Sequence, residues 1–468
     1  MSTIKCIAAA LAVAGFACGP VQAAGQAKNV IFFLGDGMGP TVVTASRIYK
    51  VGESGQLTME TLKRTARVKT FSNDAQTTDS APSMSAYMTG VKMNNEVLSM
   101  SPDTIAVAPG KDANNNNGGV NNCAPDNGKP VETILELAKK QGKVIGAITT
   151  TELTHATPAA TYSHICHRDA MYDIAAQAVP GSAGYNTALG DGVDVLMGGG
   201  RNYWTPYVVN TGNKETDNER GRADGRNLLN EMTAKGYTVV ATKDELAQAD
   251  TGKLIGLFSK ESHLQYDMDR VASKKGEGTT QPSLAEMTSK AIDVLSNNPK
   301  GYFLMVEGGR IDHALHGTNA KRALDDTVAF DEAIRVALAK VDLSNTLIVV
   351  TADHDHTMTI NGYSGRGNSI LDISRSYRDG QPSKDADGNT YTTLVFGNGK
   401  NRPEVRTSVD SAEARSDGYL QEVGIRMGGE THGGGDVMLF ADGAEANTFK
   451  GTIDNTKVFD LMRSALGL

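Results

Sequence analysis

Short apolar runs recur along the chain, and they end in glycine, aspartate or glutamate. Uninterrupted runs of this length, rich in β-branched and aromatic residues, are typical of strands that are buried on both faces of a sheet. The clearest runs cover residues 29–34, 143–149, 193–197, 302–306, 347–351 and 437–440.

Between these runs, apolar residues are spaced three or four positions apart, which is the period of an amphipathic helix. Alternating strands and helices predict an α/β fold, with a large, mostly parallel central sheet that is covered by helices on both faces. The helical spacing is seen at Val131, Ile134, Leu135 and Ala138, at Leu284, Met287, Ile292 and Leu295, and at Leu324, Val328, Ile334, Leu338 and Val341.

Residues 361–430 break this alternation and are rich in Gly, Asp and Ser. We interpret them as a cap-like insertion over one edge of the sheet, within a single domain that covers residues 24–468. Asp385, Asp387 and Asn389 resemble part of a calcium-binding loop, but the later Glu of an EF-hand is absent. A plain turn is therefore the preferred interpretation.

Residues 1–23 have the layout of a secretory signal peptide: one lysine, an apolar run over 7–17, and a small-x-small cleavage motif that ends at Ala23. The apolar run is too short to span a bilayer comfortably. We expect a soluble protein that is periplasmic or secreted. Lipid attachment at Cys18 is the less favoured alternative, because Gly15 stands where a lipoprotein signal has leucine.

The composition supports a soluble globular protein, with 39% hydrophobic and 21% charged residues. The formal net charge of −8 disfavours nucleic acids and anionic membrane surfaces as partners. Once residues 1–23 are removed, only Cys123 and Cys166 remain. Two cysteines in an exported protein are expected to form a disulfide. Two free buried thiols are the alternative.

The candidate chemistry lies directly after predicted strands. Asp36, Glu307, Asp353 and His354 each follow one of the apolar runs. In open α/β sheets, ligands bind outside the carboxyl ends of the strands, so these side chains should converge. A single strand-terminal Asp is as often a turn or helix-capping residue, and the inference depends on the whole set.

Further candidate ligands lie elsewhere. Asp312 and His316 are one helical turn apart, and His432 precedes a run of glycines. Carboxylates with imidazoles suit zinc, and oxygen-only positions suit magnesium. Ser80 opens a helix-like segment, where serine is usually a cap but is also well placed as a nucleophile toward an anion. The absence of a G-x-S-x-G motif disfavours a lipase-type serine hydrolase, so a nucleophilic Ser80 would need activation by metal.

Five segments in the same order carry a resemblance to a known family: GDGMG (35–39), TTDSAPS (77–83), TELTHATPAATYSHICHR (151–168), EGGRIDHALH (307–316) with TADHDH (351–356), and ETHGGG (430–435). On these segments the chain resembles the alkaline phosphatases, over essentially its whole length after residue 23.

The resemblance implies hydrolysis of phosphate monoesters to an alcohol and phosphate through a phosphoserine on Ser80. It also implies two zinc ions, one magnesium ion, and Arg168 as the residue that clamps phosphate. By the same resemblance, one zinc would be held by Asp312, His316 and His432, the second by Asp36, Asp353 and His354, and magnesium by Asp36, Thr157 and Glu307.

Two positions depart from the best-known bacterial pattern of that family. His155 stands where that pattern has Asp, and His313 where it has Lys; the animal enzymes look similar to this chain at both. Imidazole is a softer ligand than carboxylate, so we expect the third site to accept zinc or cobalt as well as magnesium. His356 would support the metal ligands, although a core histidine is an equal interpretation of the sequence.

Other functions stay open at this point. One is a related metal-dependent phosphodiesterase or sulfatase, and another is an exported protein that binds metal or phosphate without catalysis. The resemblance also raises the possibility of a homodimer. The preferred ester and the role of residues 361–430 do not follow from the sequence.

Overall fold

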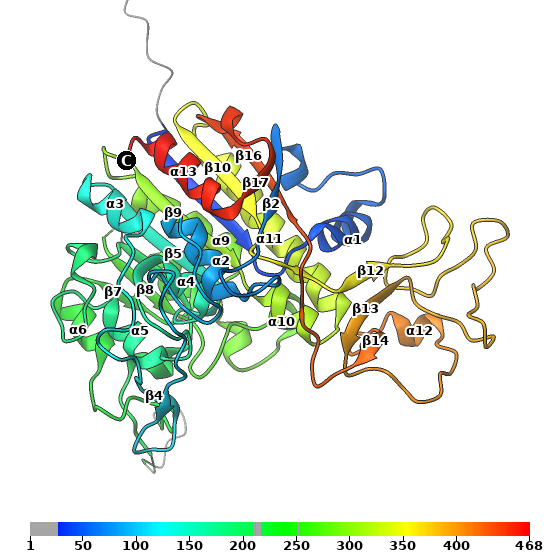
Figure 1. Ribbon diagram of the computed structural model, residues 1–468, viewed down its shortest axis with the longest axis horizontal. Coiled ribbons are helices and arrows are strands. Elements are labelled where there is room, and N and C mark those ends of the chain that lie inside the picture. Colours follow the sequence, from blue (N-terminus) through cyan, green and yellow to red (C-terminus); the bar gives the residue numbers. More distant parts are fainter. Residues whose placement is uncertain (1–26, 210, 212–216, 251) are drawn as a thin grey trace, which may run out of the picture.

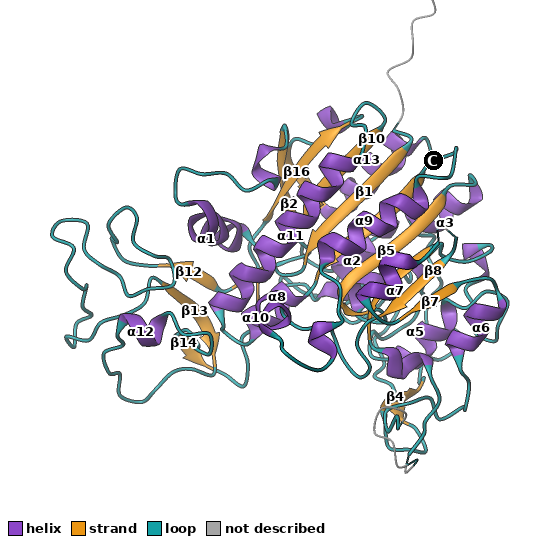
Figure 2. Cartoon of the chain, turned by 180° about the vertical axis from the view of Figure 1, so that it is seen from behind, coloured by secondary structure: helices purple, strands orange, loops and turns teal. Residues whose placement is uncertain are grey.

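The computed structural model describes residues 27–209, 211, 217–250 and 252–468. The predicted signal peptide lies outside the described residues. One ten-stranded sheet forms the centre of the molecule (Figures 1 and 2). All of its strands run in one direction except β16, which is antiparallel to both neighbours. The order across the sheet is β17 (Gly451–Asp454), β2 (Arg64–Lys69), β16 (Val437–Gly443), β10 (Thr346–Thr351), β1 (Asn29–Gly35), β9 (Tyr302–Gly308), β5 (Val144–Glu152), β6 (Val195–Gly199), β8 (Leu254–Leu257) and β7 (Thr238–Val240).

The predicted α/β class is confirmed, and so are the six strands that the apolar runs indicated. These six are neighbours in the sheet, and every residue of β9 and β10 is buried. The strands that the pattern missed are β2 and β17 at one edge and β8 and β7 at the other. β2 alternates exposed and buried residues and β7 is three residues long, so neither has a long apolar run.

Helices cover both faces of the sheet. The long helices α9 (Leu284–Leu295) and α11 (Ala320–Lys340) pack together, and α1 (Pro40–Val51) packs beside α11. A second group, which packs around α2, consists of α2 (Ser80–Thr89), α3 (Ile134–Lys140), α4 (Ala156–Tyr162) and α13 (Asn455–Leu466). Shorter helices lie in the connections: α5 (Met171–Gln177), α6 (Leu228–Ala234), α7 (Lys243–Gln248), α8 (Asp267–Ala272), α10 (Arg310–His316) and α12 (Ser411–Ala414).

A small three-stranded sheet stands away from the large one (Figure 1, yellow to orange). It is formed by β12 (Met358–Ile360), β13 (Leu394–Gly399) and β14 (Val423–Arg426), with long loops and α12 between them. Most of this unit falls within residues 361–430. Asp385 accepts hydrogen bonds from the backbone N–H groups of Asp387 and Asn389 and pairs with Arg406, as expected for a plain turn.

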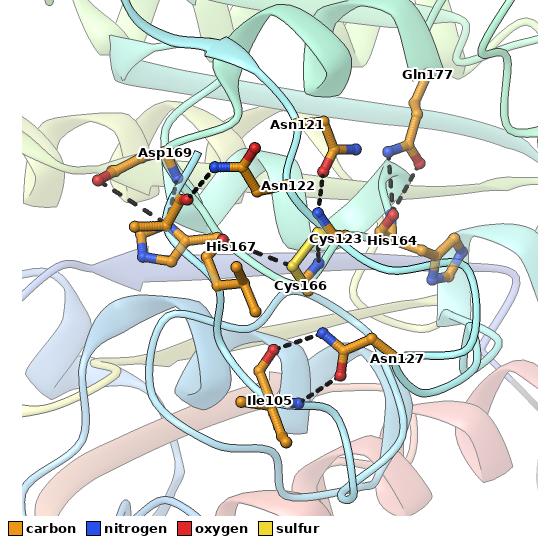
Figure 3. Close-up of a disulfide and its surroundings, with 12 residues drawn as sticks. Ile105, Asn121, Asn122, Cys123, Asn127, His164, Cys166, His167, Asp169 and Gln177 are labelled. Atoms are coloured by element: carbon orange, nitrogen blue, oxygen red, sulfur yellow. Dashed lines mark hydrogen bonds and ion pairs between the residues drawn. A yellow bond between two sulfur atoms is a disulfide. The ribbon is translucent and has the colours of Figure 1, made fainter. Parts of the chain in front are cut away.

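Two short ribbons complete the fold: β11 (Asp355–His356) with β15 (His432–Gly433), and β3 (Gly110–Lys111) with β4 (Asn117–Val120). The predicted disulfide is confirmed: Cys123 and Cys166 are bonded, with their Cα atoms 5.8 Å apart (Figure 3). Cys166 lies two residues before Arg168, so the disulfide anchors the segment that carries this arginine.

Candidate active site

The carboxyl ends of three central strands bring the first candidate residues together. β1 lies between β10 and β9, and Leu34 is in register with Thr351 on one side and Glu307 on the other. Asp36, Asp353 and Glu307 therefore reach the same edge of the sheet, and all three are fully buried. The convergence predicted from the strand ends is what the structure shows.

One cluster of potential metal ligands is centred on Asp312 of α10. Its Oδ1 lies 3.2 Å from Nε2 of His316 and 3.5 Å from Nε2 of His432. The two imidazole nitrogens are 3.1 Å apart. The Nδ1 atoms are used elsewhere: His316 Nδ1 is 2.6 Å from the carbonyl oxygen of Glu430, and His432 Nδ1 is 2.8 Å from that of Thr78. These bonds leave both Nε2 lone pairs directed at the carboxylate, which is the arrangement a bound zinc requires.

His356 lies behind this cluster. Its Nε2 is 2.7 Å from Asp312 Oδ1 and its Nδ1 is 2.6 Å from Glu430 Oε2. Burial alone would lower the pKa of His356, but the two carboxylates raise it to about 10. The ring therefore orients Asp312 through a hydrogen bond.

The second cluster consists of Asp36, Asp353 and His354. His354 Nε2 lies 3.2 Å from Asp36 Oδ1 and 3.4 Å from Asp353 Oδ2. The two clusters adjoin, because the rings of His354 and His432 stack with centroids 3.5 Å apart. Ser80 lies at the second cluster: its Oγ is 3.3 Å from His354 Nε2 and 3.5 Å from Asp36 Oδ1.

Ser80 is the first residue of α2, and Asp79 caps the helix by accepting a hydrogen bond of 2.8 Å from the N–H of Ala81. Asp79 also binds Arg168, whose Nη1 donates to Asp79 Oδ1 at 2.8 Å. The same carboxylate thus sets the position of both Ser80 and Arg168. The other arm of the guanidinium, Nη2, donates to Nε2 of His155 at 3.0 Å.

A third group of oxygen and nitrogen atoms lies beside Asp36. It contains Glu307, Thr157 and His155, and one ligand atom each of Asp36, His155 and Glu307 lies within 4.8 Å of the others. Thr149 and Thr151 donate hydrogen bonds to Glu307 Oε2. Within the described part of the chain, the buried atoms here that lack a hydrogen-bond partner are Asp36 Oδ2, Glu307 Oε1, Thr157 Oγ1 and His155 Nδ1, together with Asp353 Oδ2 in the second cluster.

The protonation equilibria show how strongly this centre is desolvated. Burial, followed by the nearby carboxylates, raises the pKa of Asp36 well above its usual range and that of Glu307 to about 7. Burial would also raise the pKa of Asp312, but the surrounding imidazoles hold it well below its usual range. Burial lowers the pKa of His354 strongly, so this ring is neutral. Buried acidic groups without enough positive partners, beside neutral imidazoles, fit bound cations.

His313 is a half-buried residue of α10. It packs against the ring of His155 at a centroid distance of 5.4 Å and against His263 at 4.3 Å. Burial lowers the pKa of His313 to about 4, so the ring is neutral at physiological pH.

The sequence reasoning missed several residues that the fold places here. Asp79 was inside the quoted TTDSAPS motif, and its place before a helix start was the available signal. Glu430 was likewise quoted in a motif but given no role. His263 lies in the loop after β8, and no local pattern marks it. Thr149 and Thr151, which donate to Glu307, were also missed. They lie in the polar last part of β5, which begins as an apolar strand.

The three adjoining clusters at the carboxyl edge of the large sheet, with Ser80 beside them, define a centre that can bind metal ions. Comparison with known proteins identifies the family to which the chain belongs. The alkaline phosphatase family model matches residues 27–468. The chain is 37% identical to alkaline phosphatase of Gadus morhua over 452 residues, covering 91% of this chain and 89% of that protein. It is 36% identical to the tissue-nonspecific alkaline phosphatase of Homo sapiens, covering 94% and 83%.

The chain belongs to the alkaline phosphatase family, and it is a metal-dependent hydrolase of phosphate monoesters. Solved structures agree with the fold. Thermus thermophilus alkaline phosphatase aligns with a TM-score of 0.67 at 25% identity, covering 98% of this chain and 96% of that one. Alkaline phosphatase of the Antarctic bacterium TAB5 aligns with a TM-score of 0.64 at 21% identity, covering 95% and 99%. No helix in the described ranges is both long and apolar enough to cross a bilayer.

Proposed function

We propose that the chain hydrolyses phosphate monoesters through a phosphoserine on Ser80, with two zinc ions and one magnesium ion in its three clusters. The observation that carries this proposal is the position of the Ser80 hydroxyl, within 3.5 Å of Asp36 and His354. A serine at the start of a helix, beside two groups of metal ligands, is placed to attack a phosphate that the cations hold.

The residues present fit these cations. Asp312, His316 and His432 offer one carboxylate and two imidazoles for one zinc, and Asp36, Asp353 and His354 offer two carboxylates and one imidazole for the other. When bound, the cations supply charge neutralisation and Lewis acidity. Three divalent ions more than offset the four buried carboxylates, so an otherwise acidic centre becomes attractive to a phosphate dianion.

In the proposed reaction, Ser80 Oγ forms a bond to phosphorus as the bond to the ester oxygen breaks, and the alcohol leaves. Water then attacks the phosphoserine, the bond between phosphorus and Ser80 Oγ breaks, and phosphate is released. Arg168 presents a planar fork that binds two phosphoryl oxygens, and Asp79 holds this fork next to Ser80.

The third site is proposed to bind magnesium through Asp36, Thr157 and Glu307, and to accept zinc or cobalt because His155 adjoins it. Nε2 of His155 receives a hydrogen bond from Arg168, which places the proton of the neutral ring on Nδ1. Direct ligation through Nδ1 would require that proton to move and the bond to Arg168 to break. We therefore expect zinc at this site to weaken phosphate binding relative to magnesium. Metal analysis after dialysis against mixed metals would refute the wider selectivity if magnesium alone returned.

The experiment that tests the proposed function is trapping of labelled phosphate on the protein, with the metal content measured on the same sample. Ser80→Ala should remove the phosphoenzyme and most turnover. Ser46→Ala is a matched control, because Ser46 is also a buried helical serine, here on α1. Covalent label on Ser80→Ala would refute the assignment. Hydrolysis of bis-p-nitrophenyl phosphate in preference to p-nitrophenyl phosphate would favour a phosphodiesterase instead.

Export and self-association are also proposed. The disulfide supports a periplasmic or secreted location, since such bonds persist in oxidising compartments. Exposed apolar side chains within 361–430, including Tyr363, Tyr377, Val405 and Ile425, support a subunit contact made by this region in a homodimer. Sedimentation of the wild type and Tyr363→Ser would contradict the dimer if both were monomeric.

A further inference from the structure

Arg310 is a cationic side chain that is linked to Arg168 through His313 and His155, and the mechanism above does not use it. It starts α10, the helix that carries Asp312, His313 and His316. Arg310, His313 and His316 are successive neighbours at a spacing of three residues, so they follow one another along one side of the helix. A group that extends from His316 past His313 therefore reaches Arg310.

The guanidinium of Arg310 is held by neighbouring side chains, but it forms no ion pair with a carboxylate of the described residues. Its Nη1 donates to His313 Nδ1 at 2.9 Å, and its Cζ lies 3.8 Å above the centre of the Tyr266 ring. Nε is buried and has no hydrogen-bond partner among the described residues. No carboxylate of the described ranges lies within ion-pair distance of this guanidinium.

Arg322 contacts the same Tyr266 ring, and it provides a comparison because its charge is paired. Its Cζ is 5.1 Å from the centre of Tyr266, but its Nε pairs with Asp269 at 3.0 Å. The two arginines share one aromatic contact and differ in the ion pair. Arg310 has no ion pair among the described residues. Its charge acts only at longer range, where it opposes the effect of burial, which raises the pKa values of Glu152 and Asp326.

A cavity opens beside this charge. Its volume is about 500 Å³, and it is lined by Gln265, Tyr266, Asp269, Ala272, Ser273 and Arg310. This size suits a small organic molecule. The lining offers the ring of Tyr266, the guanidinium of Arg310, and the amide and hydroxyl groups of Gln265 and Ser273. Asp269 also lines the cavity, but its charge is engaged by Arg322.

A row of side chains connects the cavity to the phosphate-clamping arginine. Arg168 bonds to His155, His155 packs on His313, and His313 bonds to Arg310. His313 Nδ1 accepts from Arg310, so the proton of this neutral ring is on Nε2. His263 packs against His313 and is held by the backbone N–H of Glu152, which donates to its Nδ1 at 3.0 Å. Burial lowers the pKa values of His155 and His313, so these rings are neutral and add no charge of their own between the two arginines.

We propose that Arg310, with Tyr266, binds a second anionic group on the alcohol part of the substrate. The preferred substrates would then be phosphate monoesters whose alcohol carries a carboxylate or another anion. This inference rests on the proposed function, which places the reacting phosphate at Arg168 beside Ser80. It adds that the alcohol part of the substrate lies along α10, toward Arg310. A guanidinium in a partly desolvated site, bonded to an anion, would contribute about tenfold or more to kcat/KM.

The test compares 4-carboxyphenyl phosphate with its neutral methyl ester, 4-(methoxycarbonyl)phenyl phosphate, on the metal-loaded protein. The quantity measured is the ratio of the two kcat/KM values, which cancels any general loss of activity. Arg310→Met should lower this ratio about tenfold, and Arg310→Lys should lower it less. The control Arg335→Met should leave it near the wild-type value, because Arg335 pairs with Glu332 on α11 and does not line the cavity.

Two results would overturn the inference. An unchanged ratio in Arg310→Met, with both substrates still hydrolysed, would refute the second anion site while leaving the proposed function intact. A ratio that falls equally in Arg335→Met would show that the loss of any surface cation produces the effect, and that it does not come from Arg310. Failure of the wild type to hydrolyse either ester would instead refute the proposed function, and this inference with it.

Discussion

Removing the divalent cations with excess EDTA should destabilise the fold, and the loss should grow as the pH rises. Asp36, Glu307, Asp312 and Asp353 are all buried at one edge of the sheet. Once the cations are gone, the neighbours of these carboxyl groups are each other, the imidazoles, a few hydroxyl groups and the backbone N–H groups of Gly37 and His354. Ionising them in place is then costly, and the folded state prefers to keep some of them protonated.

The size of the effect follows from Glu307. Burial raises the pKa of this group from 4.5 to about 7. A raised carboxyl pKa means that the folded state binds the proton more tightly than the unfolded state. The contribution of protonated Glu307 to the stability of the chelated protein is therefore complete below pH 4.5, and it is lost as the pH rises through 7. The difference corresponds to about 3 kcal/mol. The pKa values of Asp36 and Asp353 are also raised, whereas that of Asp312 is lowered and opposes the trend.

Scanning calorimetry of the chelated and metal-loaded protein at pH 5 and pH 8 measures this directly. The chelated protein should melt a few degrees lower at pH 8 than at pH 5 as a result of this group. Glu307→Gln keeps the shape of the side chain and removes its charge, so the chelated variant should lose less between the two pH values. A chelated wild type with the melting temperature of the metal-loaded form at pH 8, or one more stable at pH 8 than at pH 5, would refute the reasoning.

Three further predictions concern the residues that hold the site in place. Cys123→Ser removes the disulfide, whose 43-residue separation is worth about 4 kcal/mol by loop entropy; a change in the free energy of unfolding below 1 kcal/mol would contradict this. Asp79→Asn should release Arg168 and weaken competitive inhibition by inorganic phosphate about tenfold, and unchanged inhibition would exclude an orienting role. Glu136 lies 2.7 Å from His164; burial opposes both charges, but their pairing lowers the pKa of Glu136 below 4.5 and raises that of His164 above 6.5. Both groups are charged only at pH values between the lowered pKa of Glu136 and the raised pKa of His164. Glu136→Gln should therefore lower the melting temperature more at pH 5.5 than at pH 8.5, and equal losses would count against the pair.

The sequence alone determined the central strands, the fold class and the disulfide. Strands such as β9 and β10 are buried on both faces, so their apolar runs are visible locally. The edge strands β7 and β17 were not predictable in this way, because they are short and half-exposed, and the neighbouring strand decides whether they pair. The polar residues after the strands were also visible, since the carboxyl ends of parallel strands must meet at one edge.

Only the tertiary structure decided how the side chains combine around that edge. Asp79 caps a helix in the sequence, but its second role, holding Arg168, depends on two segments 89 residues apart that fold against each other. Glu430 gains its role through His356, 74 residues away. The lack of an ion pair at Arg310 is likewise a property of the fold, because it depends on how close the neighbouring carboxylates Glu152 and Asp326 come. The local pattern of apolar and polar residues indicates which residues are buried and where strands end. Contacts between distant side chains depend on tertiary packing, which no short stretch of sequence encodes.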